Sequence, residues 1–145
     1  MSVSDRPNVR PLDFTTEREE WSRYDLADNS ILKVKFVLTQ VRRNNDEYAV
    51  DTSRLYIVLT NERGEPDARV RTPQEVQNSI TNRNIRFTTV LQDWNEYVLD
   101  DGSRVRIQPM VNSVSKTSLF DNHGNPVYWV EVLQSTQVQK PDPEN

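Results

Sequence analysis

Hydrophobic and polar residues alternate most regularly in two stretches of the chain. In the first stretch the apolar residues occupy every second position: Leu32, Val34, Phe36 and Leu38. The polar residues of the same stretch are Lys33, Lys35 and Thr39. Alternation with a period of two is typical of a strand that buries one face. The second stretch repeats it, with Val105, Ile107, Pro109 and Val111 set against Arg104, Arg106 and Asn112.

The alternation changes phase near the end of both stretches. Val41 and Val114 are apolar at positions where the pattern requires a polar residue. One extra residue, a β-bulge, shifts the apolar face in this way, so we predict a bulge in each strand. Pro109 has no N–H group for a ladder, which predicts an edge or a bulge at its position.

The remaining elements follow from turn and cap residues. Residues 27–30 and 100–103 contain Asp-Asn and Asp-Gly pairs, which predict tight hairpin turns. The Phe-Thr-Thr segments at 14–16 and 87–89 favour strands, and a loop of some ten residues precedes third strands at 54–60 and 127–133. Thr72 and Glu75 form a capping-box pattern around Pro73, which predicts a short helix over residues 73–80.

These paired elements belong to an internal repeat. Residues 10–43 shifted by 73 positions fall on residues 83–116 with ten identities, and residues 55–58 match residues 127–130. The identical pairs are Arg10/Arg83, Phe14/Phe87, Thr15/Thr88, Thr16/Thr89, Trp21/Trp94, Tyr24/Tyr97, Leu26/Leu99, Asp28/Asp101, Ser30/Ser103 and Val41/Val114. We therefore divide the chain into a tail at 1–9, a unit at 10–60, a linker with a short helix at 61–82, a second unit at 83–138 and a tail at 139–145.

The expected fold is mainly β. Two copies of a small antiparallel meander, related by a pseudo-two-fold axis, should pack through their apolar rows as a sandwich or a small closed barrel. A unit of about 50 residues buries too little surface to be stable alone, so the units should share one core. An ancestor with a single unit would have been a homodimer.

Composition narrows the class of protein. The chain has 145 residues, 34% of them hydrophobic, a low share that either its two polar tails or dependence of the folded part on a partner chain would explain. There is no cysteine, which excludes disulfides and thiolate chemistry, and the N-terminus lacks a signal-peptide pattern. We expect a cytoplasmic protein with no membrane segment. The net charge of −4, without a basic block, disfavours nucleic acid as a partner.

Few residues suggest catalytic chemistry. Trp21 and Trp94 could anchor a ligand, but as the largest residue of each unit they fit a core role better. Asp28 and Asp101 could form a carboxylate pair, although turn chemistry explains both. His123 has no second histidine or nucleophile motif beside it, and the three glycines cannot form a phosphate loop. We expect no enzyme activity, catalytic residue, metal or cofactor.

The function expected from the sequence is a non-enzymatic protein-interaction or assembly module. It could work by edge-strand addition, self-association or a groove between the units. Its possible interaction surface comprises Lys33, Lys35, Arg104, Arg106, Trp129 and His123. The alternative is a single-stranded nucleic-acid-binding domain that uses the basic strand faces and the aromatic residues.

Overall fold

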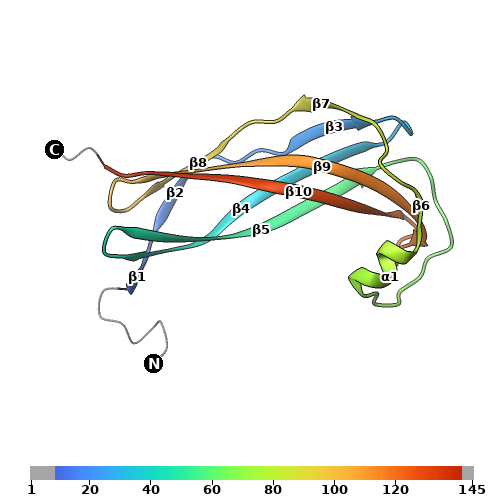
Figure 1. Cartoon of the computed structure of the whole chain (residues 1–145), viewed down its shortest axis with the longest axis horizontal. Helices are drawn as coiled ribbons and strands as arrows, with labels where there is room; N and C mark the ends of the chain where they lie inside the picture. The colour runs from blue at the N-terminus through green and yellow to red at the C-terminus, as the bar shows by residue number, and fades with distance from the viewer. Residues whose placement is uncertain (1–8, 142–145) are drawn as a thin grey trace.

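A computed structural model describes residues 9–141 and contains two antiparallel sheets of five strands and one short helix (Figure 1). The predicted tails at 1–9 and 139–145 lie mostly outside the described residues. The strands of the first sheet are β1 (Val9–Leu12), β3 (Ser22–Leu26), β4 (Ile31–Asn44), β5 (Glu47–Leu59) and β7 (Phe87–Leu91). Those of the second sheet are β2 (Phe14–Arg18), β6 (Ile80–Asn82), β8 (Asn95–Leu99), β9 (Arg104–Phe120) and β10 (Pro126–Gln139).

Each sheet is built around one long hairpin. β4 pairs with β5 along its whole length, and β9 pairs in the same way with β10. On its other side β4 pairs with β3 and β1, whereas β9 pairs with β8 and β6. The helix α1 (Pro73–Asn78) lies at the end of the molecule opposite the tip of the β4–β5 hairpin (Figure 1).

The two halves of the chain exchange one strand. β2 comes from the first half but pairs with β8, and β7 comes from the second half but pairs with β3. The registers agree: Thr15 faces Val98 in one pair, and Thr88 faces Asp25 in the other. Thr88 lies 73 positions after Thr15, and Val98 lies 73 positions after Asp25. Every sheet is therefore completed by a strand from the other half.

Both predicted bulges are present. Leu38 faces Thr52 and Gln40 faces Asp51, so Thr39 is the extra residue of β4. In β9 the register skips Asn112, which lies 73 positions after Thr39. Pro109 is fully buried and faces Gln134 of β10, at a point where β8 has ended and β6 has not begun. β9 is thus paired on one side only there, as the proline requires.

The core consists of two clusters, and each draws on both sheets. One cluster contains Leu12, Phe36, Leu38, Val41, Tyr97, Leu99, Val105 and Ile107. The other contains Tyr24, Leu26, Leu32, Val34, Ile85, Val114, Tyr128 and Val130. The predicted apolar rows therefore meet between the sheets, as a sandwich would have them. The alternative of a closed barrel is wrong for the described residues, because β5 and β10 are not paired with each other.

Trp21 and Trp94 are not core residues, contrary to the prediction. Both are half-buried and lie outside the two clusters. The Lys35 ammonium lies 5.1 Å from the centre of the Trp21 ring, and the Arg106 guanidinium lies 4.5 Å from that of Trp94. Tyr24 and Tyr97 fill the core instead, each fully buried.

The third strand of the first half begins earlier than predicted. β5 starts at Glu47, directly after a two-residue turn in which Asn45 has a φ of 57°. Tyr48 faces Arg43 and Tyr128 faces Lys116, and these two basic residues lie 73 positions apart. Tyr48, not Tyr56, therefore has the place in the β4–β5 hairpin that Tyr128 has in the β9–β10 hairpin. The second loop is also shorter than predicted, spanning only residues 121–125.

The helix forms as the capping box predicts. The Thr72 hydroxyl accepts the N–H of Glu75, and the Glu75 carboxylate accepts the N–H of Thr72. It ends at Asn78, two residues before the predicted end, because Ile80 already belongs to β6. Within residues 9–141 no helix is long and apolar enough to cross a membrane.

Candidate functional site

The sandwich is open along one side. On the other side the chain passes between the sheets four times, from β1 to β2, from β2 to β3, from β6 to β7 and from β7 to β8. The open side is bordered by β5 and β10, each of which pairs with one neighbour only. We call the groove between residues 52–64 and residues 124–134 the edge slot.

Direct contacts close the edge slot at both ends. At one end the Thr52 hydroxyl donates to the Gln134 side-chain oxygen at 2.8 Å. At the other end the N–H of Gly64 donates to the carbonyl of Gly124 at 2.9 Å. A side chain at Gly64 would collide with the ring of Phe120, so glycine lets the linker approach the 121–125 turn closely. About ten residues of β5 and the following loop border the opening between these contacts.

Two adjoining cavities form the interior of the edge slot. One has a volume of about 340 Å³ and is lined by Tyr56, Ile57, Val58, Asp121, Asn125, Pro126, Val127 and Tyr128. The other, of about 290 Å³, is lined by Arg54, Tyr56, Asn112, Trp129, Val130, Glu131, Val132 and Leu133. Tyr56 belongs to both, so the cavities meet at its ring. The lining combines aromatic, aliphatic and charged side chains, which is common in binding grooves.

β5 exposes apolar residues on both of its faces. Tyr56 faces Val34 in the ladder and so points to the inner side, yet it is 39% exposed because no strand covers it. Leu55, Ile57 and Leu59 point to the outer side and are 44%, 43% and 47% exposed. A long edge strand with exposed apolar side chains is a template for pairing with another strand.

Charged groups line both rims of the edge slot. The Arg54 guanidinium lies 5.6 Å from the centre of the Tyr56 ring, and Arg63 donates to the carbonyls of Thr60 and Glu62. Neither arginine forms an ion pair within residues 9–141. On the opposite rim Glu131 accepts the indole N–H of Trp129 at 3.2 Å. The two arginines can therefore each receive a carboxylate from a ligand.

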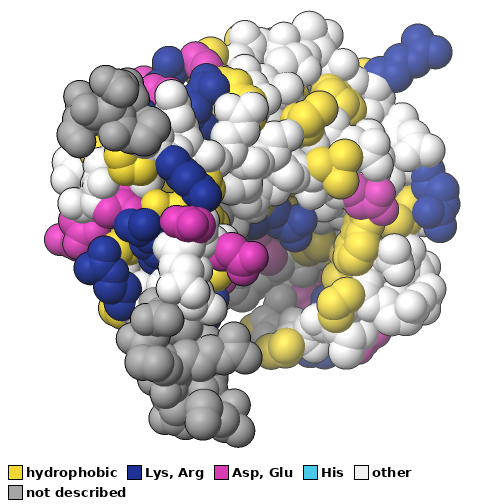
Figure 2. Space-filling view, turned by 60° about the vertical axis from the view of Figure 1, so that its left-hand side comes forward, with side chains coloured by type: hydrophobic (Ala, Val, Ile, Leu, Met, Phe, Trp, Pro, Cys, Tyr) yellow, Lys and Arg dark blue, Asp and Glu magenta, His cyan; other side chains and the backbone are white. Residues whose placement is uncertain are grey.

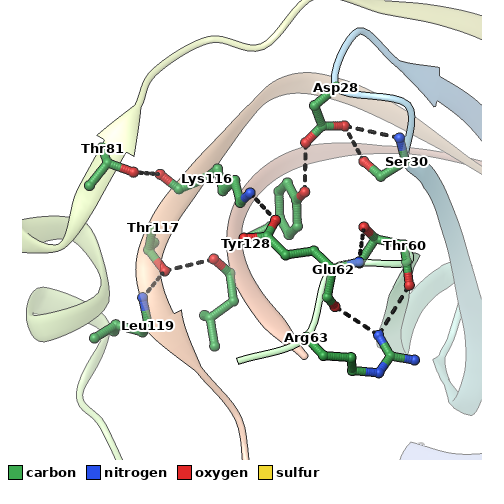
Figure 3. Close-up of polar contacts among 11 residues, drawn as sticks. Asp28, Ser30, Thr60, Glu62, Arg63, Thr81, Lys116, Thr117, Leu119 and Tyr128 are labelled. Carbon is green, nitrogen blue, oxygen red and sulfur yellow. Dashed lines mark hydrogen bonds and ion pairs between the residues drawn. The ribbon is translucent and has the colours of Figure 1, made fainter. Parts of the chain in front are cut away.

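A partly buried polar network lies near the Gly64–Gly124 end of the edge slot (Figure 3). The Tyr128 hydroxyl donates to Asp28 at 2.6 Å, and Asp28 also accepts the N–H and the hydroxyl of Ser30. Burial and then the Asp28 hydrogen bond raise the pKa of Tyr128 to about 12. Burial alone would raise the pKa of Asp28, but the hydrogen bonds from Ser30 and Tyr128 outweigh it and lower that pKa. Lys116 pairs with Glu62 nearby.

The same network recurs at the opposite end of the sandwich. The Tyr48 hydroxyl donates to Asp101 at 2.7 Å, and Arg43 pairs with the same carboxylate at 3.0 Å. Burial would raise the pKa of Asp101, but the hydrogen bonds from Tyr48 and Ser103 outweigh it and lower that pKa. The predicted turn role of both aspartates is thus confirmed, and each also binds a tyrosine from the other half of the chain. About 13 residues of β4 separate the two networks, roughly 40 Å at ~3.3 Å per residue, so the two carboxylates cannot act as a pair.

The four basic residues of the predicted surface do not form one stripe. Lys33 and Lys35 lie on β4 of the first sheet, whereas Arg104 and Arg106 lie on β9 of the second. Three of them pair with acidic side chains: Lys35 with Glu19 at 3.6 Å, Arg104 with Glu17 at 2.6 Å and Arg106 with Glu96 at 3.0 Å. Figure 2 shows basic and acidic side chains interleaved over part of the surface, with hydrophobic ones gathered beside a hollow.

The remaining two predicted residues lie differently. Trp129 lines the edge slot and is half-buried there. His123 is exposed in the 121–125 turn, where its N–H donates to Asp121 at 2.8 Å, so it is the turn residue that the sequence indicates. Sequence reasoning missed Tyr56 and Arg54, because alternation assigns them to the inner face of β5 without showing that no strand covers them.

Within residues 9–141 no three His, Cys, Asp or Glu side chains are grouped closely enough to hold a metal ion. The edge slot is therefore the candidate functional site. No protein-family model, curated protein sequence or solved structure matches the chain.

Proposed function

We propose that this chain is a non-enzymatic binding module that takes up an extended polypeptide segment in the edge slot. The observation that carries the proposal is the pair of long edge strands, β5 and β10, that border an open groove lined by Tyr56 and Trp129. An extended peptide can hydrogen-bond to the main chain of an edge strand, and its alternate side chains can enter pockets beside that strand.

The lining suggests which peptide would fit. The pockets around Tyr56 and Val132 favour apolar side chains at alternate positions of the ligand. Arg54 and Arg63 on the β5 rim have no carboxylate partner within the described residues, so an acidic side chain in the ligand would complement them. The proposed ligand is therefore an extended segment with alternating apolar residues and at least one Asp or Glu.

A selection experiment tests this proposal. Random eight-residue peptides are selected on the immobilised full chain, and enriched sequences are measured by fluorescence anisotropy. Tyr56→Ala should weaken binding about 30-fold, the factor that corresponds to ~2 kcal/mol for an aromatic hot spot. Arg54→Glu should reverse the preference for acidic peptides.

Matched variants outside the edge slot serve as controls. Val90→Ala changes an exposed residue of β7, and Trp21→Ala changes a half-buried tryptophan outside the groove, so both should leave binding unchanged. Binding of a labelled single-stranded oligonucleotide at low salt is measured in parallel, to test the alternative of nucleic-acid binding. The proposal fails if no peptide is enriched, or if Tyr56→Ala and Arg54→Glu bind the selected peptides as the native chain does.

The same proposal includes the origin of the fold by duplication of one unit. Irregular features of the backbone recur 73 positions apart: the bulges at Thr39 and Asn112, and the left-handed residues Asn29 and Gly102. The exchanged strands β2 and β7 share one register. These coincidences support an ancestor in which two identical units exchanged strands as a homodimer.

A further inference from the structure

We infer that two copies of this chain can exchange halves, so that the first half of one copy folds with the second half of the other. This inference does not depend on the proposed ligand. It starts from the pairing of β2 with β8 and of β7 with β3, which makes each sheet incomplete without a strand from the other half.

Neither half contains all the residues of either core cluster. In the cluster around Tyr97, Leu12, Phe36 and Val41 come from the first half, and Tyr97 and Ile107 from the second. The other cluster mixes the halves in the same way. The association of halves is therefore required for folding, and all of these contacts can equally be made by a half that belongs to another copy.

The linker between the halves decides whether a half folds with the other half of its own chain or with that of another copy. Residues 60–72 join β5 to α1 without a helix or strand, and Val70 in this stretch is 97% exposed. A linker that joins two parts of one chain holds them at an effective concentration on the order of millimolar. The closed monomer therefore dominates at micromolar protein, and a linker too short to span the distance shifts the equilibrium to the exchanged dimer.

The exchanged dimer would carry two edge slots. Each would lie between β5 of one copy and β10 of the other, because these strands belong to different halves. The dimer would thus present the same groove twice, and a partner with two matching segments would bind it more tightly through the joined sites.

The test uses full chains in which residues 66–71 are deleted. The deletion should give a folded dimer at micromolar concentration by light scattering coupled to gel filtration. Replacing residues 66–71 by six Gly and Ser residues keeps the length and the backbone N–H at position 67 that donates to the Asp121 carbonyl, but removes the ion pair between Asp67 and Arg69, and this variant should stay monomeric.

Disulfide formation then identifies the interface, because the native chain has no cysteine. Thr15 and Val98 face each other in the β2–β8 ladder, within the distance that a disulfide can bridge. Deletion chains carrying Thr15→Cys are refolded with differently tagged deletion chains carrying Val98→Cys, and the mixed pair should cross-link. Thr15→Cys with Thr88→Cys is the matched control and should not cross-link above background, because Thr88 pairs with Asp25 in the other sheet.

The inference is overturned if the deletion variant is a monomer, folded or unfolded, since exchange should rescue the shortened chain. A dimer in which the Thr15→Cys and Val98→Cys chains cross-link no more than the control pair would overturn it as well. A failure of the peptide selection would leave these outcomes unaffected, so the two proposals are tested separately.

Discussion

At the scale of single residues, two tyrosines do more for this fold than the more conspicuous tryptophans. Tyr128 and Tyr48 each donate a hydrogen bond from one half of the chain to a turn carboxylate in the other half. These carboxylates already accept hydrogen bonds from Ser30 and Ser103 within their own turns. Each tyrosine therefore fixes a hairpin turn of one sheet against a strand of the opposite sheet.

Removal of the Tyr128 hydroxyl should reveal this role. Tyr128→Phe loses a hydrogen bond to a charged acceptor, and we expect the free energy of unfolding to fall by about 1.5–3 kcal/mol. Urea unfolding followed by tryptophan fluorescence measures the change. Tyr56→Phe is the matched control, because the Tyr56 ring is 39% exposed and its change should stay within about 0.5 kcal/mol. Equal effects of the two variants would contradict this account.

The same tyrosine predicts a pH dependence. The pKa of Tyr128 is raised to about 12 from its ordinary value near 10, so folding favours the neutral phenol. Its contribution to stability is complete below pH 10 and disappears as the pH rises through about 12. Unfolding by urea at pH 9, 10 and 11 should show a decline in the free energy of unfolding that is shallower in Tyr128→Phe.

On the acid side the lowered pKa values of Asp28 and Asp101 predict a loss of stability as the pH falls below about 4.

At the scale of elements, the hairpin turns allow a direct comparison between the halves. Asn29 has a φ of 67° and Gly102, at the matching turn position, has a φ of 87°. The left-handed region costs most residues about 1–2 kcal/mol, and asparagine less. Gly102→Ala should therefore lower the melting temperature more than Gly102→Asn does, as calorimetry would show. The opposite order would mean that the two turns are not equivalent.

Elements governed by local chemistry could be predicted from the sequence. The capping box gave the helix, the turn pairs gave the hairpins at 27–30 and 100–103, and the phase change gave the bulges at Thr39 and Asn112. The start of β5 was missed, although Asn45 and Asp46 offer the same turn chemistry as Asp28 and Asn29. The exchange of β2 and β7 was also missed, since alternation shows which face is buried but not which strand is the neighbour.

The residues of the candidate site also divide into those that the sequence could single out and those that depend on the assembled fold. Trp129 could be singled out because Trp129 has no aromatic counterpart in the first half of the chain. The grouping of Tyr56 and Arg54 with Trp129 depends on two edge strands lying opposite each other, which is a property of the assembled sandwich. The predicted basic surface depended on how side chains are arranged in space, which the sequence alone does not show. Three of its four basic side chains form ion pairs, with Glu17, Glu19 and Glu96.

At the scale of the whole molecule, the exchanged strands predict that the chain survives a cut between its halves. Arg69 lies in the linker with its side chain 77% exposed, and brief trypsin treatment of the native chain should cut after this residue first. The two fragments should elute together at the position of the intact chain, because β2 and β7 hold each half in the sheet of the other.

The cut should nevertheless change how stability depends on concentration. In the intact chain the linker keeps the halves together, so the urea midpoint is independent of protein concentration. After the cut, unfolding releases two molecules, and the midpoint should rise with concentration by mass action. Arg69→Gln with Arg71→Gln should slow the cut without changing the fold and so provides the control. Fragments that separate on gel filtration without denaturant would show that the contacts across β2 and β8 are too weak to unite the halves.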